Sequence, residues 1–189
     1  MKSCSHRTLG QFLTATYLQK YPKFCRSAFS FGCIQPDKNP TTYLKGSLQW
    51  QWLRGHNWDN ANQYIRKTGN RLQARKNLKL LDFYRLGKLI HYTADAFTYA
   101  HNNNYTQNLS AHRNYESCLH SKLEEYLADL SNDFRIAFDP SDSVAEFIVK
   151  NHKRYMGHLP CVDNDMEYCV RMCAQVVQLM LQSKELATL

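Results

Sequence analysis

Residues that interrupt helices are scarce in this sequence. Only seven glycines and five prolines occur among 189 residues, and none lies between positions 88 and 139 or between 161 and 189. A turn-rich all-β fold and a low-complexity chain are therefore both a poor match. Long uninterrupted stretches instead predict an all-α, multi-helix bundle.

Two further absences concern cysteine spacing and membrane segments. The seven cysteines include no C-x-x-C pair, which argues against a disulfide framework and a zinc ribbon and favours reduced thiols. Mean hydropathy is −0.57, no apolar run approaches the length of a membrane span, and the first residues lack the pattern of a secretory signal. We therefore expect a cytoplasmic protein with at most peripheral membrane contact.

The charge balance is basic, with 24 Lys and Arg against 16 Asp and Glu, a net charge of +8. The positive electrostatic potential of such a protein attracts phosphoesters, nucleic acids and anionic lipid surfaces, and the net charge alone does not discriminate among these partners. The basic residues are scattered and form no nucleic-acid tail. Nucleic acid is therefore the less favoured partner.

Hydrophobic periodicity places the helices. Apolar residues at three- and four-residue steps predict a helix over 83–97, and further helices are predicted at 6–20, 60–75, 111–130, 144–153 and 163–186. The segment 31–59 holds five Gly or Pro residues and all three tryptophans, which predicts loops and short helices across one side of the bundle. No internal repeat is visible, so residues 1–189 are expected to form one domain.

Two His/carboxylate pairs have helical spacing. His91 and Asp95 are four residues apart, as are His112 and Glu116, and His101 lies between the pairs. Residues at i and i+4 share a helix face, and imidazole with carboxylate, without thiolate, is typical of catalytic zinc. The alternative is that each pair is an ordinary surface contact.

Two upstream residues could join these pairs. Asp37 follows Pro36, and His56 follows Gly55, so both are predicted in loops shaped by Pro or Gly, where functional residues concentrate. Each alone is more often a helix cap.

Taken together, this order of residues resembles the zinc-dependent phospholipases C of bacteria, which share an all-helical fold and a three-zinc cluster with the fungal single-strand nucleases. The resemblance rests on segments 87–95, 101–106 and 112–116, with 32–37, His56 and His6 in the family's order. It implies a bundle of the phospholipase C/single-strand nuclease type that encloses a multinuclear zinc site.

The resemblance also implies three sets of ligands for two or three zinc ions. The first set is Asp37, His56, His91 and Asp95. The second set is His101, His112 and Glu116. The third set is His6, a bridging Asp95, and the amine and carbonyl of residue 1. Family members have a processed N-terminal Trp at that position, whereas this chain has Met1, whose removal the bulky Lys2 should discourage.

The activity implied is hydrolysis of a phosphoester, most simply a phospholipid headgroup, by zinc-bound hydroxide. Asp37 would act as ligand, general base or both, and Glu116 in place of Asp favours the phospholipase branch. Candidate substrate-binding residues are Tyr43, Trp58 and Asn104; the aromatic ones could hold choline, stack a base or merely pack one end of the bundle. Two alternatives stay open: a nuclease or nucleotidase on the same cluster, and a non-catalytic zinc-binding helical module.

Overall fold

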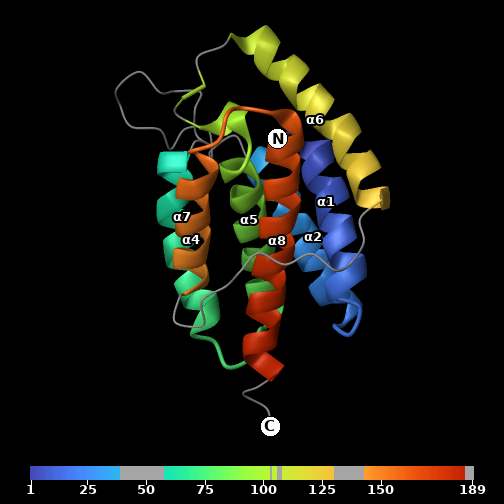
Figure 1. Ribbon diagram of the computed structural model, residues 1–189. Helices are drawn as coiled ribbons and strands as arrows, with labels where there is room; N and C mark the ends of the chain where they lie inside the picture. Colours follow the sequence, from blue (N-terminus) through green and yellow to red (C-terminus); the bar gives the residue numbers. More distant parts are fainter. Residues whose placement is uncertain (39–57, 103, 106–107, 130–142, 186–189) are drawn as a thin grey trace.

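The computed structural model describes residues 1–38, 58–102, 104–105, 108–129 and 143–185, and within them the regular structure is helical throughout (Figure 1). The helices are α1 (Ser3–Tyr17), α2 (Lys23–Lys38), α4 (Trp58–Gln73), α5 (Leu80–Ala96), the 3-10 helix η1 (Tyr99–His101), α6 (Leu109–Asp129), α7 (Val144–Tyr155) and α8 (Val162–Glu185). The predicted all-α bundle is confirmed. No described helix is long and apolar enough to cross a membrane.

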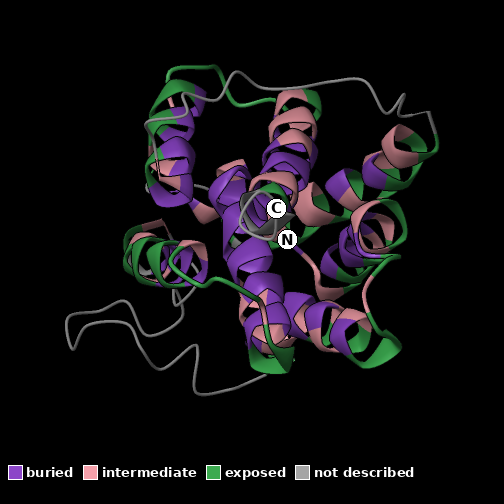
Figure 2. Ribbon diagram, turned by 90° about the horizontal axis from the view of Figure 1, so that it is seen from below, coloured by how far each residue is buried: buried purple, intermediate pink, exposed green. Residues whose placement is uncertain are grey.

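Helix α5 is the centre of the bundle. It packs against α2, α4 and α8, and in Figure 1 it lies between the α4/α7 pair and the α1/α2 pair, behind α8. Figure 2 shows the surrounding helices turning their buried sides inward. Because α5 is enclosed on so many sides, even its polar residues His91, Thr93 and Asp95 are almost completely buried.

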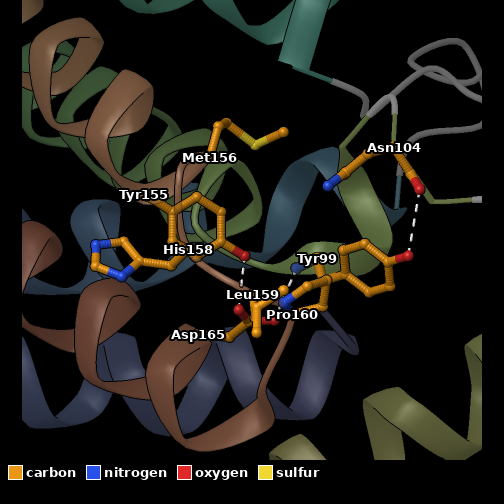
Figure 3. A pocket seen from close by; sticks show the side chains of 8 residues that line it. All are labelled: Tyr99, Asn104, Tyr155, Met156, His158, Leu159, Pro160 and Asp165. Carbon is orange, nitrogen blue, oxygen red and sulfur yellow. Dashed lines mark hydrogen bonds between the residues drawn. The ribbon is translucent and has the colours of Figure 1, made fainter.

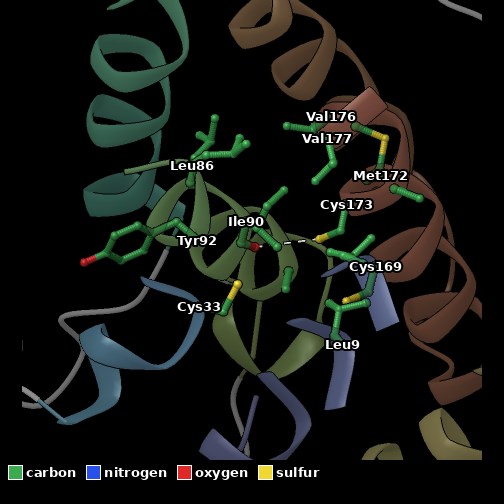
Figure 4. Packing of buried hydrophobic residues seen from close by; sticks show 14 of the residues in the cluster. Leu9, Cys33, Leu86, Ile90, Tyr92, Cys169, Met172, Cys173, Val176 and Val177 are labelled. Atoms are coloured by element: carbon green, nitrogen blue, oxygen red, sulfur yellow. Dashed lines mark hydrogen bonds between the residues drawn. The ribbon is translucent and has the colours of Figure 1, made fainter. Parts of the chain in front are cut away.

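The core beside α5 is made of aliphatic and sulfur-containing side chains. Ile90 of α5 faces α8, where the Cys173 thiol donates a hydrogen bond to the Ile90 carbonyl at 3.7 Å (Figure 4). Cys169 and Cys173 are buried, and all seven cysteines are free thiols. Buried helical cysteines therefore serve here as small apolar core residues.

Two glycines let α2 and α5 approach each other closely. A Cβ atom on Gly87 would lie 2.1 Å from the Phe29 carbonyl oxygen, and one on Gly32 would lie 2.3 Å from the Tyr84 carbonyl oxygen. Only backbone without a side chain fits at this crossing. The contact brings the second halves of both helices together, and these halves carry Asp37 and His91.

The prediction for segment 31–59 was wrong over 31–38. These residues are the second half of α2, in which Gly32 lies at the crossing with α5. Pro36 lies in the last turn and costs the helix one backbone hydrogen bond. Asp37 therefore lies on a helix and not in a loop. Residues 39–57, which include Tyr43 and His56, lie outside the described residues.

Candidate metal centre

The first group of candidate ligands is buried at the meeting point of α1 and α5. His6 Nε2 lies 3.1 Å from Asp95 Oδ1, and His91 Nε2 lies 3.3 Å from Asp95 Oδ2. All three side chains are at most 1% exposed. Their ligand atoms lie within 4.8 Å of one another, so a single cation could contact all three.

The orientation of His91 is fixed by the neighbouring helix. Its Nδ1 donates a hydrogen bond to the Cys33 carbonyl oxygen of α2 at 2.9 Å, and its ring stacks on that of His6 with centroids 3.8 Å apart. A proton held at Nδ1 leaves Nε2 as the atom with a lone pair, and this is the usual arrangement of a metal-binding histidine. Nε2 is the atom that faces Asp95.

The second group is more open to solvent. His101 comes from η1, and His112 and Glu116 lie one turn apart on α6; Glu116 Oε1 is 3.5 Å from His101 Nε2 and 3.4 Å from His112 Nε2. Exposed fractions rise from 14% for His101 and Glu116 to 27% for His112. A molecule from solvent can therefore reach this group, whereas the first group is closed.

The amino group of Met1 lies between the two groups. It is 2.6 Å from Asp95 Oδ1, 2.5 Å from His101 Nε2 and 3.4 Å from Glu116 Oε1. The Met1 side chain is anchored in the core, where its sulfur accepts a hydrogen bond from the Cys169 thiol at 3.5 Å. The position that the resemblance assigns to an N-terminal Trp is thus filled by Met1 in the structure.

The pKa values of the groups in this centre are shifted by burial and by the neighbouring charges. Burial alone would raise the pKa of Asp95, but His101, the Met1 amine and His6 outweigh it and hold that pKa well below its usual range. Burial lowers the pKa of His6 to about 4, with a further contribution from His91, and burial also lowers the pKa of His101. Zinc binds deprotonated ligands, so the low pKa of the Asp95 carboxyl group and the lowered pKa values of His6 and His101 favour its binding.

Asp37 borders the first group from the end of α2. Its Oδ1 lies 3.7 Å from His91 Nε2, and its Oδ2 accepts a hydrogen bond from the Ser3 hydroxyl at 2.8 Å. The side chain is 12% exposed, so it is neither sealed in nor fully in solvent. Ser3 fixes one carboxylate oxygen, and the other is turned toward His91.

The sequence matches the zinc dependent phospholipase C family over residues 5–161. The chain belongs to this family. Neither a curated protein nor a solved structure matches the chain. Membership of the zinc-dependent phospholipase C family supports a zinc phosphoesterase, and the two donor groups consist of the imidazole and carboxylate ligands that zinc prefers when a coordination position is kept for water.

One group of residues behind the centre was not predicted. The Asp165 carboxylate of α8 is fully buried and accepts hydrogen bonds from the Tyr99 backbone amide at 2.8 Å, the Tyr155 hydroxyl at 2.6 Å and the Tyr115 hydroxyl. Tyr99 begins the helical turn that ends at His101, and Tyr115 precedes Glu116. Asp165 therefore holds both segments that carry the second group, η1 and α6. The sequence gives no sign of this role, because Asp165 looks like an ordinary acidic residue in the first turn of a helix.

Asn104 and Trp58 are not members of the two donor groups. Asn104 lines a pocket with Tyr99, Tyr155, Met156, His158, Leu159, Pro160 and Asp165 (Figure 3). Trp58, at the start of α4, stacks on His152 of α7 with ring centroids 3.5 Å apart. A role in substrate binding stays a prediction for both residues and for Tyr43.

His152 is a buried neutral histidine with a defined tautomer. Asn102 donates its amide hydrogens to the carbonyls of Ala96 and Thr98, so Asn102 Oδ1 must accept, and His152 Nε2 donates to it at 2.8 Å. Burial lowers the pKa of His152 to about 4, although Asp59 opposes this shift. The bond joins α7 to the segment that carries His101.

Acid should therefore destabilise the protein through His152. Between pH 6.5 and about 4 the unfolded chain binds a proton at this residue and the folded chain does not, so stability falls as pH falls through that window and levels off below it. The loss is about 3 kcal/mol at most. Urea unfolding measured across this pH range should show that the free energy of unfolding of His152→Gln, which keeps a hydrogen-bond donor, depends less steeply on pH. An unchanged pH dependence would contradict the assignment.

Proposed function

We propose that the protein is a phospholipase C-like hydrolase that cleaves a phosphodiester, with a phospholipid as its natural substrate class. The observation that carries this proposal is the convergence of His6, His91, His101 and the Met1 amine on the single carboxylate of Asp95. A buried carboxylate that faces so many nitrogen donors is suited to bridge two metal ions. Family membership supports the phosphoester class.

The proposed ligands are divided between the closed and open parts of the centre. His6, His91 and Asp95 would hold zinc in the closed part, with Asp37 at its edge, and His101, His112 and Glu116 in the open part. When bound there, zinc supplies a strong nucleophile from water at neutral pH and neutralises charge on phosphoryl oxygens. His56 and the Met1 amine complete the proposed set of ligands.

Asp37 is the proposed general base. Its carboxylate takes a proton from the attacking water, a bond forms between the water oxygen and phosphorus, and the bond from phosphorus to the glycerol oxygen breaks. The glycerol oxygen takes up the proton that Asp37 accepted, which returns Asp37 to its ionised form, so the products are a phosphomonoester of the headgroup and a diacylglycerol. The Ser3 hydroxyl orients the carboxylate for this transfer.

Asp37→Asn tests this role. We expect release of phosphocholine from short-chain phosphatidylcholine to fall by about 10²-fold or more, because the amide cannot accept the proton, while zinc content stays close to that of the wild type. Glu124→Gln, on an exposed part of α6, is the control and should be fully active. Full activity of Asp37→Asn would rule out Asp37 as the general base.

Assays with other phosphoesters separate the competing functions. A nuclease or nucleotidase on the same cluster would cleave single-stranded DNA or nucleotides and no lipid. A non-catalytic zinc module would hold zinc and turn over no phosphodiester, including a chromogenic one.

We also propose that residues 1–189 form one domain, located in the cytoplasm, and that its membrane contact is peripheral.

A further inference from the structure

Large apolar side chains are exposed on α2 and at the start of α5. Phe24 and Phe31 are 61% and 52% exposed, and Leu80 and Leu81 are 46% and 61% exposed. The two phenylalanines are seven residues apart and so share one face of α2. The Phe31 ring stacks on Tyr84 of α5 with centroids 5.9 Å apart, which joins the two helices into one surface.

Most of the net charge of the protein lies on the same two segments. Residues 20–38 and 75–88 contain nine Lys or Arg and two Asp, a net +7 of the chain's +8. Of the two acids, Asp37 belongs to the candidate metal centre, and Asp82 is buried and paired with Arg85 at 2.9 Å. Lys20, Lys23 and Lys79 are exposed, and each lies within four residues of Phe24 or Leu80 along the chain.

We propose that this surface, formed by the outer face of α2 and the start of α5, docks on an anionic phospholipid bilayer. Exposed phenylalanine and leucine insert at the level of the headgroups, and lysines around them bind anionic lipid. The choice of a bilayer over nucleic acid rests on the proposed function and on Leu80 and Leu81, because aliphatic side chains gain from lipid and cannot stack on bases. Docking along α2 holds Asp37, in the last turn of that helix, beside the bilayer.

Co-sedimentation with vesicles tests the docking directly and without catalysis. The vesicles are phosphatidylcholine alone or phosphatidylcholine with about one-third phosphatidylserine. We expect binding to the anionic vesicles only, weakened by salt because the charges are exposed. Phe24→Ser/Phe31→Ser should bind roughly tenfold more weakly or worse, and each of Lys20→Gln, Lys23→Gln and Lys79→Gln should bind roughly fivefold more weakly.

Matched controls lie on other surfaces. Leu159 is 88% exposed, so Leu159→Ser removes an apolar side chain outside the surface, and Lys153→Gln/Arg154→Gln removes two exposed charges of α7. Both should bind vesicles as the wild type does. Equal losses in the controls, or wild-type binding by Phe24→Ser/Phe31→Ser, would overturn the proposal.

Two further measurements keep docking and catalysis apart. Cleavage of a soluble short-chain phosphodiester should be unchanged in every surface variant, so loss of vesicle binding with intact cleavage supports docking. Vesicle binding by a protein that cleaves no phosphodiester would overturn the proposed function and leave the docking intact. Binding of single-stranded DNA that these variants weaken, with no binding to vesicles, would overturn the docking.

Discussion

Asp95→Asn is expected to have the largest effect of any single substitution on zinc content. Its two carboxylate oxygens face His6, His91, His101 and the Met1 amine at distances from 2.6 to 3.7 Å, and an amide can neither bridge two cations nor balance their charge. We expect at least one zinc ion per chain to be lost, and phosphodiester cleavage to fall by roughly a thousandfold or more. Elemental analysis and the phosphocholine assay measure the two losses.

Asp163→Asn is the matched control for this substitution. Asp163 is 64% exposed and pairs at the surface with Lys122 of α6, a contact worth about 1 kcal/mol or less. It should keep wild-type zinc and activity. An Asp95→Asn protein with the zinc content of the wild type would show that the carboxylate is a structural partner of the buried histidines and not a ligand.

Gly87→Ala is expected to be the most destabilising small substitution. Its Cβ atom would lie 2.1 Å from the Phe29 carbonyl oxygen and 2.9 Å from the Cys33 amide nitrogen, both of them backbone atoms of α2. The helices must move apart, at a cost of about 3 kcal/mol or more, which exceeds the ~1 kcal/mol gained from the higher helix propensity of alanine. The same displacement pulls the Cys33 carbonyl away from His91 and should weaken zinc binding, as thermal unfolding with and without added zinc would show.

Gly69→Ala separates this effect from glycine replacement in general. Gly69 also lies within a helix, but its Cβ atom would be 3.3 Å from the side chain of Ala145, where a small adjustment suffices. Its stability should stay within about 1 kcal/mol of the wild type. If both variants unfolded alike, the close approach of α2 and α5 would not be the cause.

The candidate centre was predictable where its residues share a helix. His91 with Asp95, and His112 with Glu116, are each one turn apart, and this spacing fixes their relation without knowledge of the fold. The apolar stripe around Phe83, Leu86 and Ile90 likewise located α5. Family resemblance then related His6 and residue 1 to these pairs, and the structure brings both to Asp95.

Contacts between distant segments were not predictable in this way. Gly32 and Pro36 read as helix breakers because a sequence pattern does not show that α5 presents Gly87 at the same crossing. Asp165 reads as an acid in the first turn of a helix, yet it binds groups from η1, α6 and α7. Both cases depend on which surfaces meet, and local propensity carries no information about that.

Counting zinc ions in the purified, untagged wild-type protein tests the central claim most directly. After dialysis against a zinc buffer and removal of excess metal, elemental analysis should give two or three zinc ions per chain, three if the Met1 amine and His6 complete the cluster. A result of no zinc in the folded protein would contradict the account, because the convergence on Asp95 would then be a buried hydrogen-bonded cluster without a metal.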